Sequence, residues 1–320
     1  MSARPTGRPC GSEATTSWPA SLPLCAEGGV AMEPQGTPPH RPVLTTLQVA
    51  EYRDRGFLSI PGVLDRDLLG RLTATTERLW NEGRGLTAKT RHHDLAPGHS
   101  AETPRIRRIS SPTELDDVFV EAAFRSVLGD IAADLVGGAV KFYHAKINFK
   151  LPQGGAEIGW HQDWPVFPHT NSNLVALSIP LNPSRRGNGC LRSIPGSQGR
   201  GALSHWADGR YMLNCNASLS EADMAEAEFN EAEPGDVLAH HGLVVHGSEA
   251  NRSDEIRTTL IIQYAAADAF AYTAPVIDSV HRNRMVRGEP ASHARVEAGV
   301  IELPPDFSRG YTSIYTHQGG

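Results

Sequence analysis

Hydrophobic positions in the first half of the chain recur at the spacing expected of helices. Residues 47–52 suit a short helix that ends at Gly56, and residues 57–61 suit a short strand. Asp65 is a favourable N-cap for a second helix, which we expect to end before Gly83. The apolar stripe of this second helix consists of Leu68, Leu69, Leu72 and Leu79. The pattern therefore predicts a helix, a strand and a second helix in that order.

A third helix is predicted after Ser111, where the order Ser-Pro-Thr-Glu has the form of a capping box with proline at the first helical position. We expect this helix to continue to the glycine pair at 137–138, which would stop it. Its predicted buried face consists of Phe119, Ala123, Leu128, Ile131 and Leu135. Helices are thus expected to dominate the first half of the chain.

The second half alternates between apolar and polar positions, with Gly, Pro and Asn at the turns, and this pattern predicts short strands. In residues 140–150 one face carries Tyr143, Ala145, Ile147 and Phe149, and the opposite face carries Phe142, His144, Lys146 and Asn148. Residues 174–181 and 257–264 repeat the alternation. We expect the apolar faces to lie under the helices and the polar faces to line a cavity, as in a barrel-like sandwich.

Charge and composition argue against several classes of partner. A formal net charge of −6 and an isoelectric point near 6.2 give no general attraction to nucleic acid or to anionic membranes. No apolar run approaches the roughly 20 residues that a membrane-spanning helix needs. The cysteines, Cys10, Cys25, Cys190 and Cys215, form no C-x-x-C pair, which argues against a structural zinc site and a disulfide-rich scaffold. We therefore expect a cytoplasmic protein without nucleic-acid or membrane partners.

The first residues differ in composition from the rest of the chain. Residues 1–42 are rich in Pro, Gly, Ser and Thr without a sustained apolar period, so they are predicted to form a disordered leader. Met32 is an alternative to Met1 as the start of translation, and the leader lacks the apolar core of an export signal. Residues 43–320 are predicted to form a single domain, with a strand-rich core at about 138–268.

Candidate chemistry begins at the sequence Gly-Trp-His-Gln-Asp-Trp, residues 159–164. Positions i and i+2 of a strand point to the same face, so His161 and Asp163 can bind one metal ion together. A third ligand is required, and His246 is the candidate, because a glycine and a serine follow it and Arg257 lies eleven residues later. Two histidines and one carboxylate leave one face of an octahedral metal open, as in non-haem Fe(II) oxygenases. The guanidinium of Arg257 offers a planar fork for the far carboxylate of a co-substrate.

His240 and His241 remain alternative third ligands, although neither is followed by glycine, serine and arginine at the same spacing. Lys146 could meet a carboxylate or reach solvent at the rim of the barrel. Three arginines between residues 83 and 110 could line a site for an anionic substrate, but a solvated surface is the preferred interpretation of that basic stretch. These arginines are Arg105, Arg107 and Arg108.

From about residue 44 to residue 268 the chain resembles the phytanoyl-CoA dioxygenase family of Fe(II)- and 2-oxoglutarate-dependent oxygenases. The resembling segments read WHQD, NGCLRSIPGSQ, EPGDVLAHHGLVVHGSEANRSDEIR and QY. The resemblance implies that His161, Asp163 and His246 hold Fe(II). It also implies that Arg257 binds the distal carboxylate of 2-oxoglutarate. The implied fold is α+β, built on a double-stranded β-helix, the cupin-like jelly roll, with helices packed on the outside of one sheet.

Within that family the ectoine hydroxylases are similar in one detail, since Asn148 stands thirteen residues before His161, as in their pattern. The similarity implies that Asn148 helps to hold 2-oxoglutarate, with Ser178 and Ser248 as hydrogen-bonding residues near its carboxylate. The residues after Asp163 depart from the ectoine hydroxylase pattern, so ectoine is not assumed as the substrate.

The expected function is that of a dioxygenase that uses Fe(II), 2-oxoglutarate and O₂ to hydroxylate an aliphatic C–H bond of a small molecule, releasing succinate and CO₂. Desaturation, epoxidation or cyclisation with the same cofactors are alternatives. A cupin-like metal hydrolase or isomerase, which would not need Arg257, is another. A barrel that binds a ligand without catalysis is the third.

Overall fold

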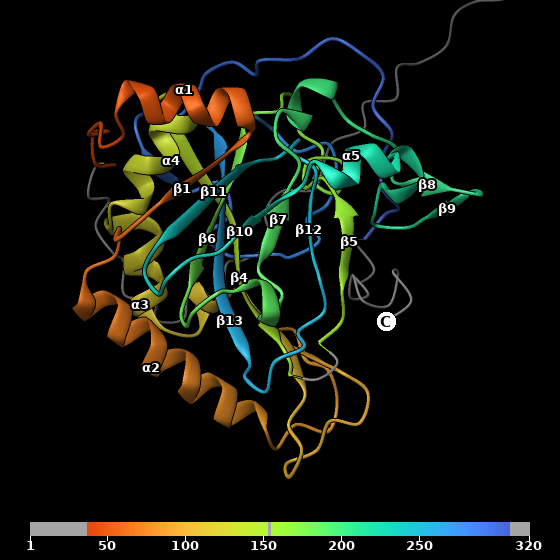
Figure 1. The fold of residues 1–320 in the computed structure, drawn as a ribbon. Coiled ribbons are helices and arrows are strands. Elements are labelled where there is room, and N and C mark those ends of the chain that lie inside the picture. The colour runs from red at the N-terminus through yellow and green to blue at the C-terminus, as the bar shows by residue number, and fades with distance from the viewer. Residues whose placement is uncertain (1–36, 153–154, 308–320) are drawn as a thin grey trace, which may run out of the picture. The chain divides into compact units, whose positions relative to one another are not determined.

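Two antiparallel sheets form the centre of the protein in a computed structural model that describes residues 37–152 and 155–307 (Figure 1). The larger sheet contains, in spatial order, β1 (Phe57–Ile60), β11 (Val237–His241), β6 (Leu174–Pro180), β13 (Arg257–Ala266), β4 (Val140–Lys150), β3 (Ile106–Ser110) and β2 (His93–Leu95), with β14 (Met285–Arg287) also paired to β4. The smaller sheet contains β10 (Glu228–Asn230), β7 (Leu191–Ser193), β12 (His246–Ser248) and β5 (Ile158–His161). A separate hairpin consists of β8 (Trp206–Ala207) and β9 (Arg210–Tyr211).

Most of the helical residues precede β4, as the apolar spacing predicted. The α-helices are α1 (Thr46–Arg55), α2 (Arg66–Gly83), α3 (Asp117–Val120), α4 (Leu128–Val136) and, later in the chain, α5 (Glu221–Ala225). The shorter helical segments are η1 (Pro112–Glu114), η2 (Glu121–Arg125), η3 (Arg186–Asn188), η4 (Ser197–Arg200) and η5 (Asn216–Ser218). Figure 1 shows α2, α3 and α4 on one side of the larger sheet and the smaller sheet on the other side.

The first two predicted helices are confirmed, although α2 includes Gly83, before which it was expected to end. Thr45 and Gln48 form a capping box at the start of α1, and α1 ends at Gly56, whose φ of 81° is the left-handed conformation that glycine readily adopts. The side chain of Asp65 accepts a hydrogen bond of 2.8 Å from the backbone N–H of Leu68 and so begins α2. Local capping chemistry is therefore sufficient to place these two elements.

The third predicted helix is wrong in its start and its continuity. Ser111 adopts a φ of 52°, and its hydroxyl donates to the carbonyl of Asp278 at 2.6 Å instead of capping a helix. Asp116 caps α3, and the π-helical segment η2 separates α3 from α4. The end of α4 at Gly137 agrees with the prediction, and all five residues of the predicted face are buried in the main core. The capping box does not form because the Ser111 hydroxyl donates to the carbonyl of Asp278, 167 positions away in the chain.

The main hydrophobic core lies between the larger sheet and the helices, and it contains the apolar strand faces that the alternation predicted. Strand side chains in this core include Ala145, Ile147, Phe149, Val175, Leu177, Ile179, Leu260, Ile262 and Tyr264. The helices contribute Leu72, Phe119, Leu128 and Ile131, which are among the largest fully buried side chains of the described residues. Each such side chain contributes about 1.5–3 kcal/mol through burial. The opposite face of the sheet is left to polar residues.

Strand β4 contains a β-bulge that the alternating pattern did not predict. On β4, Phe142 pairs with Tyr264 and His144 pairs with Gln263, which are consecutive residues of β13. Tyr143 is therefore the extra residue of the bulge. The bulge shifts the alternation by one position, so Phe142 packs in the main core and Tyr143 packs in a second cluster with Phe167. The predicted faces of Phe142 and Tyr143 are therefore wrong, whereas Lys146 and Asn148 do face the inside of the protein.

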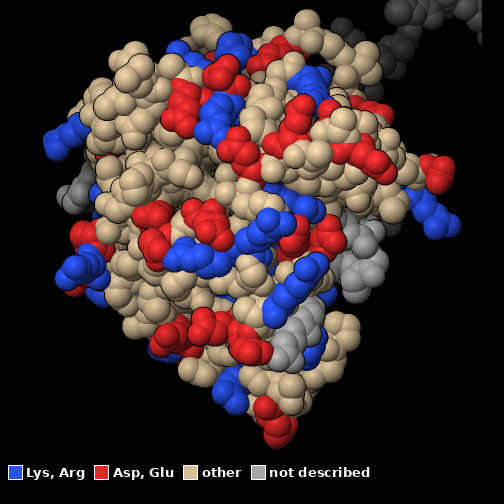
Figure 2. All heavy atoms as spheres, in the orientation of Figure 1, with Lys and Arg blue, Asp and Glu red and all other residues tan. Residues whose placement is uncertain are grey.

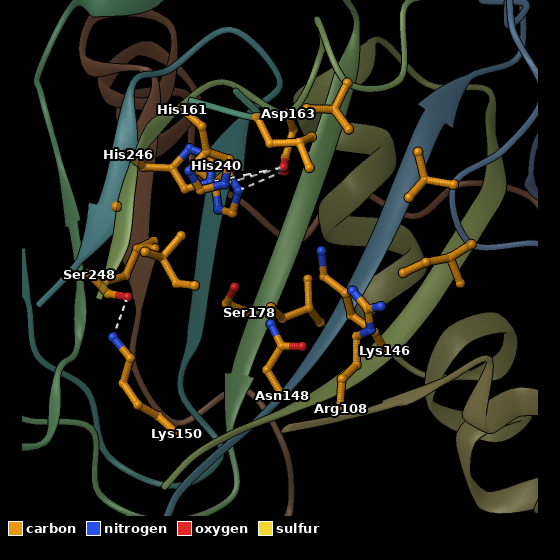
Figure 3. A pocket seen from close by; sticks show the side chains of 18 of the residues that line it. Arg108, Lys146, Asn148, Lys150, His161, Asp163, Ser178, His240, His246 and Ser248 are labelled. Atoms are coloured by element: carbon orange, nitrogen blue, oxygen red, sulfur yellow. Dashed lines mark hydrogen bonds and ion pairs between the residues drawn. The ribbon is translucent and has the colours of Figure 1, made fainter. Parts of the chain in front are cut away.

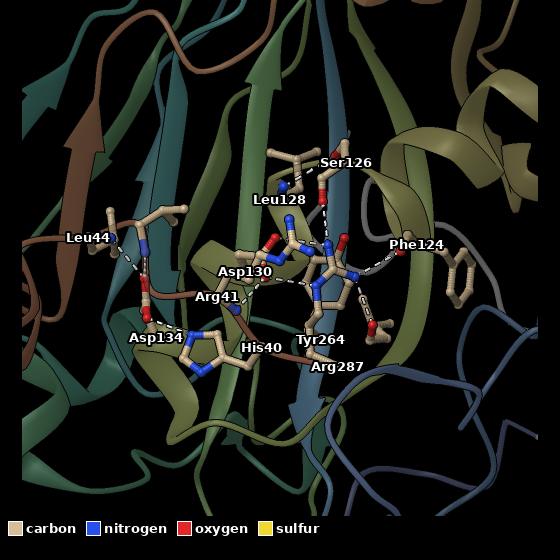
Figure 4. A network of polar contacts seen from close by, with 12 residues as sticks. His40, Arg41, Leu44, Phe124, Ser126, Leu128, Asp130, Asp134, Tyr264 and Arg287 are labelled. Carbon is tan, nitrogen blue, oxygen red and sulfur yellow. Dashed lines mark hydrogen bonds and ion pairs between the residues drawn. The ribbon is translucent and has the colours of Figure 1, made fainter. Parts of the chain in front are cut away.

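Strand β14 is joined to α4 by a buried ion pair (Figure 4). The Nε and Nη2 atoms of Arg287 donate to the two carboxylate oxygens of Asp130 at 2.9 and 3.0 Å. Its other N–H groups donate to the carbonyls of Phe124 and Ser126. Burial alone would raise the pKa of Asp130, but hydrogen bonds from Arg287 and from the backbone of Arg41 lower it.

The described surface carries both signs of charge, and acidic and basic side chains are intermingled on the face shown in Figure 2. None of the helices in the described residues has the length and apolar character required to cross a membrane. Cys190 and Cys215 are buried free thiols. The other two cysteines, Met32 and most of the predicted leader lie outside the described residues, and residues 37–42 contain no helix or strand.

Candidate metal site

A cavity between the two sheets is lined by the three predicted metal ligands and by the four residues predicted to contact 2-oxoglutarate. Figure 3 labels all of them except Arg257. The larger sheet contributes Asn148, Ser178 and Arg257, the smaller sheet contributes His161, His246 and Ser248, and Asp163 follows directly after β5. Strand alternation explains the convergence of the six strand residues, because the polar faces of both sheets are turned toward each other. Asp163 lies outside β5, after Gln162, so the two-residue spacing to His161 is not strand alternation here.

His161 and His246 lie directly opposite each other, because β5 and β12 pair in antiparallel register at these two residues. Their imidazole ring centroids are 4.2 Å apart. The Nε2 atom of each ring lies 4.0 Å from Oδ1 of Asp163. One donor atom from each of the three residues lies within 4.8 Å of the other two, and all three residues are buried. This spacing allows one ion to contact all three.

Backbone carbonyls orient both imidazoles. Nδ1 of His161 lies 2.9 Å from the carbonyl of Gly159, and Nδ1 of His246 lies 3.0 Å from the carbonyl of Val244. A carbonyl can only accept, so each Nδ1 carries the proton and each Nε2 lone pair is directed into the site. Burial lowers the pKa of His161 and lowers that of His246 well below its usual value. Both rings are therefore held neutral, as metal ligands must be.

Asp163 is oriented through its second carboxylate oxygen. Nε2 of His240 lies 3.2 Å from Oδ2 of Asp163, and the side-chain amide of Gln263 donates to the same oxygen. Burial alone would raise the pKa of Asp163, but the hydrogen bond to His240 holds it well below its usual value. The carboxylate is thus ionised, and its Oδ1 faces the two Nε2 atoms.

Arg257 lies at the other end of the cavity, at the start of β13. It is paired in register with Lys150 of β4, and its Nη1 donates to the carbonyl of Gly189. The side-chain nitrogen of Lys150 donates to Oγ of Ser248 at 2.6 Å and to the carbonyl of Glu249. Burial, with Arg257 nearby, lowers the pKa of Lys150 to about 6. This end of the cavity thus combines a permanent cation with polar donors.

Several cavity residues were missed or misjudged from the sequence. Lys150, which lines the cavity, was not selected. Gln263 was not selected either, although it contacts Asp163 and occupies an inward position of the strand alternation at 257–264, which could have identified it. His240 contacts Asp163 instead of replacing His246 in the donor cluster. The solvated-surface interpretation is wrong for Arg108, which is buried at 7% exposure and lines the cavity from β3.

The donor set fits a ferrous ion. Imidazole nitrogen and carboxylate oxygen are ligands that Fe(II) accepts, and two histidines with one carboxylate leave coordination positions open. A structural zinc site would require a fourth protein ligand, and the cluster among the described residues has three: His161, Asp163 and His246. Hydrogen bonds to the far side of each ligand fix its orientation.

Comparison with known proteins agrees with this site. The family model described as phytanoyl-CoA dioxygenase (PhyH) matches residues 52–259. The fold and the site therefore define an enzyme of the 2-oxoglutarate-dependent dioxygenase class. Within that class the chain belongs to the phytanoyl-CoA dioxygenase family, as its resembling segments implied. The expected cofactor Fe(II) and co-substrates 2-oxoglutarate and O₂ are confirmed at the level of this class.

Individual relatives are distant but cover most of the chain. A probable alpha-ketoglutarate-dependent hypophosphite dioxygenase of Stutzerimonas stutzeri is 28% identical over 264 residues, covering 80% of this chain and 90% of its own. The 2-aminoethylphosphonate dioxygenase of uncultured bacterium HF130_AEPn_1 is 26% identical, covering 69% of this chain and 81% of its own. The crystal structure of EctD from S. alaskensis with bound Fe aligns with a TM-score of 0.63 at 19% identity, covering 80% of this chain and 95% of EctD. The chain shares the fold of EctD.

Proposed function

We propose that the protein hydroxylates an aliphatic C–H bond of a small molecule, using Fe(II), 2-oxoglutarate and O₂. The observation that carries the proposal is a single cavity in which the two-histidine, one-carboxylate donor cluster and Arg257 lie together. When bound, the metal and the co-substrate supply the oxidising chemistry that consumes O₂, releases succinate and CO₂ and leaves a hydroxyl group on the substrate. We assign the two sheets to a double-stranded β-helix, which the likeness to EctD supports.

His161, Asp163 and His246 would hold the metal through the two Nε2 atoms and Oδ1. The carbonyls behind the histidines keep both lone pairs directed at the metal position before it is filled. His240 holds Oδ2 of Asp163, so the carboxylate would bind through one oxygen and leave the remaining coordination positions to the co-substrate and O₂.

Arg257 would bind the distal carboxylate of 2-oxoglutarate, because a guanidinium presents parallel N–H donors to a carboxylate. Ser248 would add a hydrogen bond: its oxygen already accepts from Lys150, so its own hydroxyl proton is available to the carboxylate. Asn148 and Ser178 line the cavity from the two strands that flank β13 and would contact the same molecule.

Apolar side chains close the rest of the cavity and exclude water from the reacting centre. These residues include Val166, Phe167, Leu213, Val276 and Ile277. A dry wall strengthens each polar contact inside the site and protects reactive species from solvent. The small substrates in the names of the two relatives, hypophosphite and 2-aminoethylphosphonate, support a small molecule as the substrate of this chain.

The proposal is tested by screening small molecules for O₂-dependent succinate formation with Fe(II) and 2-oxoglutarate. We expect a substrate to stimulate succinate release and to gain one oxygen atom, measured by mass spectrometry. Loss of two hydrogen atoms without gain of oxygen would indicate desaturation or ring closure instead. Turnover that persists without 2-oxoglutarate, and unchanged in Arg257→Ala, would contradict the proposal and favour a metal hydrolase or isomerase.

A further inference from the structure

The cavity contains a second basic cluster, apart from Arg257 and Lys150. It consists of Lys146 on β4 and Arg108 on β3, both of which line the cavity. The strand register places Arg108 opposite Asn148, and Asn148 lies two residues after Lys146 on β4. The side chains of Arg108 and Lys146 are therefore diagonal neighbours on the same face of the sheet. Figure 3 shows them next to each other, on the opposite side of the view from Lys150.

Two acidic residues act on this cluster: Asp94 lies near Arg108, and Asp163 acts on Lys146 from the metal position. Within residues 37–152 and 155–307, Lys146 makes no hydrogen bond or ion pair. Arg108 lies 3.9 Å from a carboxylate oxygen of Asp94, which also pairs with Arg107. Among the described residues, Asp163 is the one acidic side chain that lines the cavity, and its oxygens face the metal position and His240. Burial lowers the pKa of Lys146, Asp163 raises it and Arg108 lowers it further. An anion bound beside both basic side chains would therefore favour the charged form of Lys146.

Bound cofactors do not remove this excess of positive charge. Fe(II) brings two positive charges and 2-oxoglutarate brings two negative charges, so the pair is electrically balanced. Lys146 lies four residues from Lys150 along β4, or about 13 Å at the usual strand rise. The distal carboxylate at Arg257 would therefore lie far from Lys146. The second cluster is left for another anionic group.

A pocket next to the cavity also carries basic side chains, although Arg282 pairs with Asp278 and Arg91 pairs with Glu114. This pocket shares Arg108, Val276 and Ile277 with the cavity. Its wall carries the basic residues Lys89, Arg91 and Arg282, and the acidic residues Asp94 and Asp278. With Arg108 included, basic side chains outnumber acidic ones along this wall, and a concave surface of one predominant sign raises the local concentration of oppositely charged ligands.

We propose that the substrate is a small organic anion whose carboxylate or phosphonate group is bound by Lys146 and Arg108. This inference rests on the proposed function, because it assigns the metal and Arg257 to the cofactors. The planar guanidinium of Arg108 offers paired donors to two oxygens, and the ammonium of Lys146 adds a compact charge to the same group. The two residues would hold the anionic end and so direct the remainder of the substrate to the metal.

The test measures two affinities on the same protein. Isothermal titration of 2-oxoglutarate into Mn(II)-loaded protein, without O₂, gives the co-substrate affinity. Titration of the 2-oxoglutarate complex with a second small anion gives the affinity for that anion. The anions are methylphosphonate, ethylphosphonate, propionate and butyrate, and the neutral comparisons are propionamide and butyramide. The variants are Lys146→Met and Arg108→Gln. Lys141→Met is the matched control, because Lys141 is a buried lysine of the same strand that contacts the carbonyl of Ala267 outside the cavity.

We expect at least one anion to bind and its neutral analogues to bind at least tenfold more weakly. Lys146→Met and Arg108→Gln should each weaken anion binding about ten- to a hundredfold and change 2-oxoglutarate affinity less than twofold, while Lys141→Met changes neither. The tighter of the carboxylate and phosphonate probes identifies the headgroup. The inference is overturned if wild-type protein that binds 2-oxoglutarate binds none of the anions, or if the amides bind as tightly as the anions. It is also overturned if the variants weaken the binding of 2-oxoglutarate and not that of the anion. Failure of 2-oxoglutarate to bind wild-type protein at all would overturn the proposed function itself.

Discussion

Nε2 of His240 lies 3.2 Å from Oδ2 of Asp163. The other carboxylate oxygen, Oδ1, faces His161 and His246. His240 therefore acts on the metal site through the carboxylate and not as a member of the donor cluster. It reaches this position from β11, a strand of the larger sheet, whereas the two ligand histidines belong to the smaller sheet. The contact joins the two sheets at the metal site.

Replacing His240 by phenylalanine should weaken metal binding without removing a ligand. The variant keeps an aromatic ring but loses the hydrogen bond that orients Asp163, so we expect Fe(II) or Mn(II) affinity to fall about ten- to a hundredfold. Metal titration checks this, with His241→Phe as the control, because the next residue accepts a bond from Leu243 and does not touch Asp163. Equal loss in both variants would show a general packing effect.

Arg257→Lys should raise the Michaelis constant for 2-oxoglutarate about tenfold, and Arg257→Ala should raise it further. A lysine keeps the charge but not the paired, planar donors, and a charge-assisted hydrogen bond contributes about 1.5–3 kcal/mol. Initial rates of succinate formation at varied 2-oxoglutarate provide the measurement. Metal affinity should stay unchanged in both variants, since Arg257 is outside the donor cluster. An unaltered Michaelis constant would remove Arg257 from the co-substrate site.

Lys150 predicts a specific dependence of stability on pH. Burial lowers its pKa to about 6, far below the usual value of a lysine. Between pH 6 and about 10 the unfolded chain binds a proton at this residue that the folded chain does not, so this lysine makes stability rise with pH. Denaturant unfolding of wild type and Lys150→Met at pH 6.5 and pH 9 should show a larger gain in wild type. Equal gains in the two proteins would contradict the lowered pKa.

Asp130→Ala should destabilise the protein by about 3–5 kcal/mol, because it leaves the buried guanidinium of Arg287 without its carboxylate. The double variant with Arg287→Met should recover much of that loss. Since the pKa of Asp130 is lowered by folding, the stabilisation is present at neutral pH and is lost as pH falls below about 4. Denaturant unfolding at neutral and acidic pH measures both effects, and a pH-independent difference would contradict them.

The sequence predicted which side chains line the cavity better than it predicted the details of the fold. Alternation with a period of two residues follows from strand geometry alone, and it correctly predicted that Lys146 and Asn148 face the inside of the protein. The bulge at Tyr143 depends on how β4 pairs with β13, which no local pattern contains. Arg108 was misjudged for the same reason, since a run of basic residues suggests solvent until β3 is known to lie beside β4. Ser111 shows the same limit at a helix cap, where a distant carbonyl takes the hydroxyl.

Metal binding by the three donor residues is the most direct test of the account. Fe(II) or Mn(II) should be titrated without O₂ into wild type and into His161→Ala, Asp163→Ala and His246→Ala, with circular dichroism to confirm that each variant is folded. We predict one bound metal ion per wild-type chain and binding at least about a hundredfold weaker in every variant. Folded variants that bind the metal as tightly as wild type would contradict the account.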